Sequence, residues 1–391
     1  RMTQQPRHHG TKVMLAASVL AAVLGSVHAF SVFLDPLEQA FAASRGAVSL
    51  TYSLALGFLT LAVLFGHRIY ARWAASVFVL GVCSLAATGA LIAGFAPSLS
   101  LVWLGYSLLF GAANGLGYGF GLQLAAQANP GRAGFAMGVV TAAYALGAGV
   151  APPLFVVALT LGGFTAAMIG LAAVLIFAGG VCAILLRASK AKFTQSPEPS
   201  AQTKVTPTTF ALLWIGYGAG VAAGLMTIGH ATGIATGAGF TGPIWVSPAA
   251  IAVANLLGSL VAGRLTDRAK PAAVLTCLAL VTAGTVLTLG AIAGPGSAIP
   301  LLAAAGFAYG GTIAAYPAVI AKLFGMAESP RIYGRVFTAW GAAGLFAPSL
   351  AGALFDLSGT YQIALLTAAA LAVLSAAAVL ALFQSGISRA A

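Results

Sequence analysis

The chain has 391 residues, of which 60% are hydrophobic and only 6% are charged. A soluble domain of this length needs far more charged side chains on its surface, so the composition excludes that class. It indicates a membrane protein that crosses the bilayer several times.

Twelve apolar stretches are long enough to cross ~30 Å of hydrocarbon as helices, which predicts an all-α membrane protein with twelve transmembrane helices. The predicted spans are 13–34, 47–66, 74–96, 100–127, 135–159, 164–186, 209–234, 244–263, 272–294, 299–324, 336–355 and 361–384.

The basic residues predict the topology. An even number of spans puts both termini on one side, and of the 18 Lys and Arg residues only Arg45 falls in a gap on the other side. Because cytoplasmic loops are enriched in Lys and Arg, both termini are predicted to be cytoplasmic. We expect the protein in the inner (plasma) membrane of a bacterium. The net charge of +12 then follows from topology, which argues against a nucleic-acid partner.

A polar gap rich in Ser, Pro and Thr divides the chain into six spans and six spans. It predicts an N-terminal six-helix bundle over 1–186, a flexible cytoplasmic linker over 187–208 and a C-terminal six-helix bundle over 209–391.

The two halves are weakly similar in sequence. Gly115-Leu-Gly-Tyr-Gly119 recurs as Gly306-Phe-Ala-Tyr-Gly310, and Ala151-Pro-Pro-Leu154 recurs as Ala347-Pro-Ser-Leu350. Both halves begin on the same side, so the repeat is parallel. Parallel repeats are one of the known transporter layouts, in which the substrate site lies between the halves near the membrane midplane.

Gly263-Arg-Leu-Thr-Asp-Arg268, after the eighth span, resembles the G-x-L-x-D-R loop of the major facilitator superfamily. In the first-half counterpart, Tyr70 stands where that family usually has Asp. The resemblance covers the whole chain. It implies two pseudo-symmetric six-helix bundles, secondary transport by alternating access, and a gating loop that contains Gly263, Asp267 and Arg268.

Four further segments look like the branch of oxalate/formate antiporters and monocarboxylate transporters. They are Phe30–Glu38, Gly115–Gly119, Gly224–His230 and Tyr333–Trp340. This narrower resemblance implies a small organic acid, such as a monocarboxylate, as the substrate, moved by symport or antiport.

The eighth span departs from that branch. Carriers of the branch have an Arg that pairs with the substrate carboxylate, and here Ser259 occupies its place. Asn255 replaces the Asp of the monocarboxylate carriers. The oxalate carriers have a Lys in the eleventh span, where this chain has only Trp340, Thr338 and small residues nearby. The chain therefore lacks a two-point cationic clamp, which argues against oxalate itself.

Polar side chains at membrane depth are costly, so each is a candidate for substrate binding as well as for helix packing. Histidine changes charge near pH ~6.5 and suits proton exchange, and a buried phenol needs a hydrogen-bond partner. The substrate-binding candidates are Tyr118, His28, Tyr309, His230, Asn114, Asn255, Ser259, Tyr144 and Trp340.

The predicted function is gradient-driven transport of a small organic acid, with or without a coupled proton, by a protein that we expect to be a monomer in the lipid bilayer. The acid would be held by Tyr and His side chains or carried in its neutral protonated form. The alternative is an efflux carrier for a neutral or lipophilic compound, which Gly138, Gly147 and Pro152 favour because they resemble part of the drug-efflux antiporter motif. The sequence shows no P-loop, paired Asp residues or metal set in the spans, so we expect neither an enzyme nor a cofactor or metal.

The topology can be tested by labelling cysteines introduced singly in place of Glu38, Glu198 and Glu328. A membrane-impermeant reagent added outside should label the first position, and the other two should react only from the cytoplasm. Labelling of Glu38→Cys and Glu198→Cys from the same side would contradict the even span count.

Overall fold

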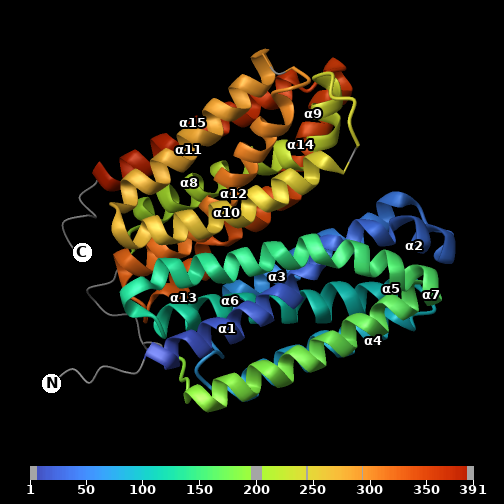
Figure 1. The fold of residues 1–391 in the computed structure, drawn as a ribbon, viewed down its shortest axis with the longest axis vertical. Helices are drawn as coiled ribbons and strands as arrows, with labels where there is room; N and C mark the ends of the chain where they lie inside the picture. The colour runs from blue at the N-terminus through green and yellow to red at the C-terminus, as the bar shows by residue number, and fades with distance from the viewer. Residues whose placement is uncertain (1–6, 195–204, 244, 293, 385–391) are drawn as a thin grey trace. The chain divides into compact units, whose positions relative to one another are not determined.

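The computed structural model describes residues 7–194, 205–243, 245–292 and 294–384, and within these ranges every regular element is helical (Figure 1). The predicted all-α fold is therefore confirmed. Lipid offers no hydrogen bonds to the backbone, and a helix satisfies its N–H and C=O groups internally.

The first part of the chain forms ten helical segments, including short 3₁₀ helices (η1, η3) and a π-helical stretch (η2). They are α1 Arg7–Leu24, η1 Gly25–Phe33, α2 Leu34–Phe41, α3 Arg45–Gly66, α4 Ala75–Gly94, α5 Leu99–Val102, η2 Trp103–Phe110, α6 Gly111–Gln127, η3 Pro130–Arg132 and α7 Ala133–Ser189.

The second part forms eight helices. They are α8 Pro207–Ile228, α9 Ala231–Gly237, α10 Val246–Arg268, α11 Pro271–Ile292, α12 Ala298–Phe324, α13 Ser329–Val336, α14 Thr338–Ser358 and α15 Gln362–Gln384. Local signals set the start of α8: the Thr206 hydroxyl accepts a hydrogen bond from the Thr209 N–H, and Pro207 occupies the first turn.

The described residues contain 11 helical stretches that are long and apolar enough to span a membrane. One of them, Pro130–Ser189, is 60 residues long and covers the predicted fifth and sixth spans. Gly162 and Gly163 have non-helical backbone angles in its middle, and Gly163 has φ 67°. This kink divides the stretch into two spans, so the 11 stretches of the described residues correspond to the twelve predicted spans.

The chain divides into two compact units. Unit 1 contains 1–130 and 143–195, and unit 2 contains 131–142 and 196–391. The first three turns of α7 thus belong with the second half of the chain, which the predicted division into 1–186 and 209–391 did not anticipate. Of the predicted linker, residues 195–204 lie outside the described residues, and α7 continues to Ser189.

Glycines bring helices into backbone contact at equivalent places in the two units. In unit 1, Gly115 of α6 lies against the backbone of Leu59 in α3. In unit 2, a Cβ atom on Gly306 of α12 would lie 2.8 Å from the carbonyl oxygen of Ile251 in α10. The glycines of the sequence repeat therefore carry out the same packing task in both halves.

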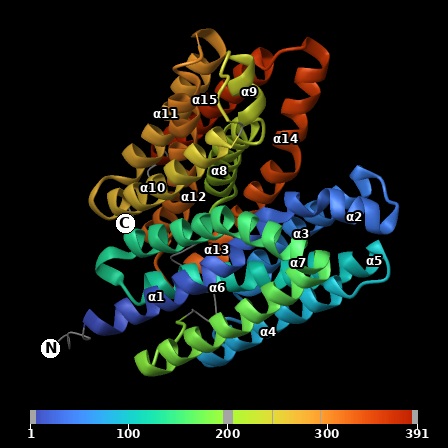
Figure 2. The same ribbon diagram turned by 45° about the vertical axis from the view of Figure 1, so that its right-hand side comes forward.

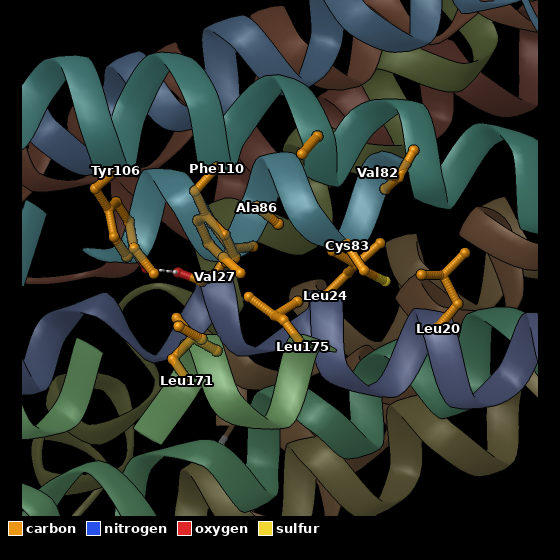
Figure 3. Close-up of a cluster of buried hydrophobic side chains, with 14 of the residues drawn as sticks. Leu20, Leu24, Val27, Val82, Cys83, Ala86, Tyr106, Phe110, Leu171 and Leu175 are labelled. Atoms are coloured by element: carbon orange, nitrogen blue, oxygen red, sulfur yellow. Dashed lines mark hydrogen bonds between the residues drawn. The ribbon is translucent and has the colours of Figure 1, made fainter. Parts of the chain in front are cut away.

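The core of unit 1 is formed where α1, α4, α6, η2 and the second half of α7 meet (Figure 3). Leu24 and Val27 pack with Phe110, and the Tyr106 hydroxyl donates a 3.4 Å hydrogen bond to the Val27 carbonyl. Large apolar side chains also remain exposed on the outside, as with Phe177 at 74%, which is the pattern of a surface that faces lipid.

We expect Gly115→Ala to destabilise the protein by about 1–3 kcal/mol, because the added methyl group meets the Leu59 backbone and the two helices must move apart. Gly57→Ala is the matched control, since no atom lies within 4 Å of its Cβ position. Thermal unfolding of the purified protein in detergent measures both. Equal melting temperatures for the two variants would contradict close packing at Gly115.

Candidate functional site

The first helix of each half is interrupted next to a histidine. In unit 1, α1 ends at Leu24 and continues as the 3₁₀ helix η1, which contains His28. In unit 2, α8 ends at Ile228, and His230 precedes α9. Interrupted membrane helices leave backbone groups available near a cavity, and they often mark binding sites in transporters.

In unit 1, His28 is the centre of an aromatic cluster. Its Nδ1 atom is hydrogen-bonded to the Tyr52 hydroxyl of α3 at 2.6 Å. Its ring packs edge-on against Tyr144 of α7, with 5.4 Å between ring centroids. All three residues are half-buried.

A second set of contacts ties this cluster to α6 and α1. The Tyr144 hydroxyl donates to Asn114 Oδ1 at 2.9 Å, and Asn114 Nδ2 donates to the Leu24 carbonyl at 2.5 Å. Leu24 is the last residue of α1 before the break, so the buried Asn114 satisfies a backbone group there. Tyr118, one turn further along α6, is buried, with its ring centroid 4.9 Å from that of Tyr144.

Four predicted site residues, His28, Asn114, Tyr118 and Tyr144, are thus brought together in unit 1. Tyr52 joins these four and was not among the predicted site residues. Its signal was a phenol within the second span, but nothing in the sequence shows that α3 turns this side chain toward His28.

His230 in unit 2 has a structural role. Its Nε2 atom donates to the Pro348 carbonyl at 2.9 Å, because a carbonyl can only accept. In the neutral ring Nδ1 is then an acceptor, and the Tyr361 hydroxyl lies 3.3 Å away. The imidazole therefore links the end of α8 to α14 and to the start of α15.

Tyr309 and Trp340 form a pair in unit 2. The indole Nε1 of Trp340 in α14 donates to the Tyr309 hydroxyl of α12 at 3.2 Å. Tyr309 is the repeat counterpart of Tyr118, because it lies in the repeated Gly306–Gly310 segment. Trp340 corresponds to Tyr144, because each comes from the span that follows the one with the tyrosine. The two halves therefore place an aromatic pair at the same position in their folds.

The Ser259 hydroxyl is occupied by the backbone. It lies 3.0 Å from the Asn255 carbonyl of its own helix and 3.1 Å from the Gly310 carbonyl of α12. The Asn255 side chain lies against Gly310 as well. These two residues hold α10 against α12, and Ser259 is fully buried.

The motif that was predicted as a loop forms the last turns of α10, because this helix continues to Arg268 instead of ending at 263 as predicted. From there it contacts the start of α7. The Asp267 carboxylate accepts the Gly134 N–H at 2.7 Å with one oxygen and the Phe135 N–H at 2.8 Å with the other. Gly263 lies in backbone contact with Gly134, whose Cβ position is 2.5 Å from the Gly263 carbonyl. A carboxylate at a helix N-terminus satisfies unpaired N–H groups and is stabilised by the helix dipole.

Arg268, the last residue of the motif, is exposed at the end of α10. A neighbouring cation also stabilises this helix end: Lys322 Nζ donates to the carbonyls of Thr266 at 3.1 Å and Ala269 at 3.2 Å. Basic groups are favourable at helix C-termini.

The family model of the Major Facilitator Superfamily matches residues 14–301. The chain belongs to the Major Facilitator Superfamily. Members of this family are transporters, so the chain is an integral membrane transporter rather than an enzyme. The resemblance inferred from the loop motif and the repeat is thereby confirmed at the level of the superfamily.

Individual relatives are distant. The uncharacterized MFS-type transporter YhjX of Escherichia coli K12 is 22% identical over 350 residues, which cover 84% of each chain. The solved structure of FucP in the outward conformation matches with a TM-score of 0.73 and 16% identity, over 96% of this chain and 99% of that one. The proton:xylose symporter XylE, bound to 6-bromo-6-deoxy-D-glucose, matches with a TM-score of 0.69 and 12% identity over 94% of each chain. At these identities the structural matches show the fold, which agrees with the predicted twelve-helix arrangement.

Asp267→Asn should destabilise the start of α7 by about 1–2 kcal/mol. An amide has a single acceptor oxygen, so at least one of the two N–H groups loses its partner, and the charge at the helix end is lost too. Hydrogen exchange at residues 134–136 measures the change. Asp356→Asn is the control, because Asp356 is exposed near the C-terminal end of α14. Unchanged protection in Asp267→Asn would show that the two hydrogen bonds from Asp267 contribute little to the stability of the start of α7.

Proposed function

We propose that the chain carries a small monocarboxylate-like organic acid together with a proton, by alternating access, and that the aromatic cluster around His28 forms part of its binding site. The observation that supports this most is the His28 side chain itself, a titratable group on the interrupted first helix, hydrogen-bonded to Tyr52.

The chemistry of the cluster suits a carboxylate. Phenol hydroxyls such as those of Tyr52 and Tyr144 can donate to a carboxylate oxygen. An anion alone is costly at membrane depth, and so is an imidazolium alone. Together they form a neutral pair, so binding of the acid anion favours protonation of His28. By linkage, protonation favours binding of the anion to the same extent.

The comparisons are compatible with coupling to protons. FucP is a fucose:proton symporter of Escherichia coli and XylE is a proton:xylose symporter, so this fold accommodates proton-coupled transport. The resemblance to oxalate/formate antiporters and monocarboxylate transporters supports the organic acid as the solute. We assign no charge-pairing role to Ser259, whose hydroxyl is held by two carbonyls.

The competing proposal is a carrier of a neutral solute. It is favoured by the eighth span, where Ser259 and Asn255 stand in place of charged residues, and by the use of Lys322 as a helix cap. A neutral solute would need only hydrogen bonds from Tyr118, Tyr309 and their partners. The pH dependence of binding distinguishes the two proposals, since a neutral solute takes up no proton.

We expect binding of a monocarboxylate to purified protein, measured by calorimetry without a gradient, to strengthen as the pH falls from about 7.5 to 5.5. The affinity should rise by up to about tenfold per pH unit while one proton is taken up per anion. The solute stays ionised over this range, since carboxylic acids titrate near pH ~4. The affinity rises as the pH falls because a proton is bound together with the solute.

His28→Gln should remove this pH dependence and weaken binding. His67→Gln is the matched control, because that imidazole follows the end of α3, where it is hydrogen-bonded to the Leu64 carbonyl, and is not one of the residues of the His28 cluster. A pH-independent affinity for the acid in the unmodified protein would overturn the coupled proton. Tight binding of neutral compounds and of no acids would overturn the organic acid in favour of the neutral solute.

A further inference from the structure

Five exposed cations gather at one end of unit 1. Arg68 and Arg72 lie between α3 and α4, and Arg187, Lys190 and Lys192 lie at the end of α7. We call these five residues the basic patch. Neither segment contains an Asp or Glu, so the sequence places no carboxylate within them.

The register of α4 against α7 explains why the two segments meet. The Cβ position of Gly94 lies against Met168, and that of Gly179 lies against Cys83. The two contacts are eleven residues apart on each helix, and the sequence numbers rise along α7 while they fall along α4, so the helices are antiparallel. A further eleven residues bring Arg72 and Lys190 to the same end, and both views show α4 and the second half of α7 side by side (Figures 1 and 2).

An aromatic stack fixes both segments. Phe193, just after Lys192, lies 5.2 Å from Tyr70 and 5.3 Å from Phe120 between ring centroids. Gln127 of α6 holds the next residue, Thr194, by two hydrogen bonds of 2.8 and 2.9 Å. These contacts hold the segments on which the basic patch lies against α6 and against each other.

Tyr70 also keeps the patch free of negative charge. It stands where the resembling loop usually has Asp, and its side chain is buried against Gly66 and Gly119. Burial raises the pKa of the Tyr70 phenol, so the group remains neutral at physiological pH.

Apolar side chains border the basic patch. The Arg68 guanidinium lies 5.0 Å above the Phe65 ring, and Trp73, beside Arg72, is 54% exposed. Further into the span, Ile184 is 69% exposed and Phe177 is 74% exposed on α7. Cations and an indole at the end of exposed apolar helices match the headgroup and acyl region of a phospholipid.

We propose that the basic patch binds the phosphate of an anionic phospholipid whose acyl chains lie along the exposed faces of α4 and α7. The site is separate from the His28 cluster, and the proposal does not depend on the transported solute. The apolar border distinguishes a lipid from a free phosphate ion, which would have no use for it. Juxtamembrane Lys and Arg residues are attracted to anionic lipids through the same electrostatics.

The test uses the full chain in phosphatidylcholine nanodiscs that contain a minor fraction of brominated phosphatidylglycerol or brominated phosphatidylcholine. Bromine quenches nearby tryptophan, and a Trp73→Phe variant isolates the contribution of Trp73. We expect the brominated anionic lipid to quench Trp73 more strongly than the brominated zwitterionic lipid at equal content, with a preference that weakens as salt is added.

Arg72→Gln combined with Lys190→Gln should reduce the apparent affinity for phosphatidylglycerol by roughly tenfold to thirtyfold, since each cation near an anionic headgroup contributes about fivefold. The matched control is Lys270→Gln combined with Arg335→Gln, which removes two exposed cations from unit 2 and should keep the preference.

Equal quenching by the two lipids, or the same loss in the control pair, would overturn a specific site. Complete displacement of the anionic lipid by inorganic phosphate at constant ionic strength would overturn it in favour of a simple phosphate site. All substituted residues are exposed, and an unchanged melting temperature in detergent confirms that the variants fold.

Discussion

Backbone contact at glycine is the interaction on which both units depend. Helices in lipid gain nothing from hiding apolar side chains from one another, so their association requires close van der Waals contact. Gly115 of α6 against Leu59 and Gly306 of α12 against Ile251 supply it, with carbonyl oxygens where a side chain would otherwise lie. The same contacts fix the rotation of α6 and α12. Tyr118 and Tyr309 follow the glycines on these helices, and the same packing brings them to Tyr144 and Trp340.

The two histidines show how equivalent places in a repeat diverge. Both follow an interruption of the first helix of a half, and both bond to a tyrosine. His230 also donates to the Pro348 carbonyl, and this ties its ring to a fixed position between three helices. His28 instead packs against Tyr144, a ring that is itself held through Asn114. His230 therefore links helices through a backbone carbonyl, whereas His28 contacts side chains of α3 and α7.

The sequence was sufficient to predict the spans because bilayer thickness sets their length, and the family because its loop motif is local. The partners of the site residues were less accessible. Whether His28 meets Tyr52 depends on the rotation of α1 against α3, and the 3₁₀ segment after Leu24 changes that rotation. The attachment of 131–142 to unit 2 depends on two N–H groups bonded to Asp267, a contact across more than 130 residues. Ser259 was a candidate for substrate binding, and its bond to Gly310 could not be read from spacing.

The junction between the second and third membrane spans has a different chemistry in each unit. In unit 2, Asp267, in the last turn of α10, presents a charge to the start of α7, and salt weakens such an interaction. In unit 1, Tyr70 occupies the corresponding place and packs into an aromatic stack with Phe78 and Phe120. That stack has no charge to screen or titrate near neutral pH. Salt that weakens the contacts of Asp267 should therefore leave the contacts of Tyr70 in place.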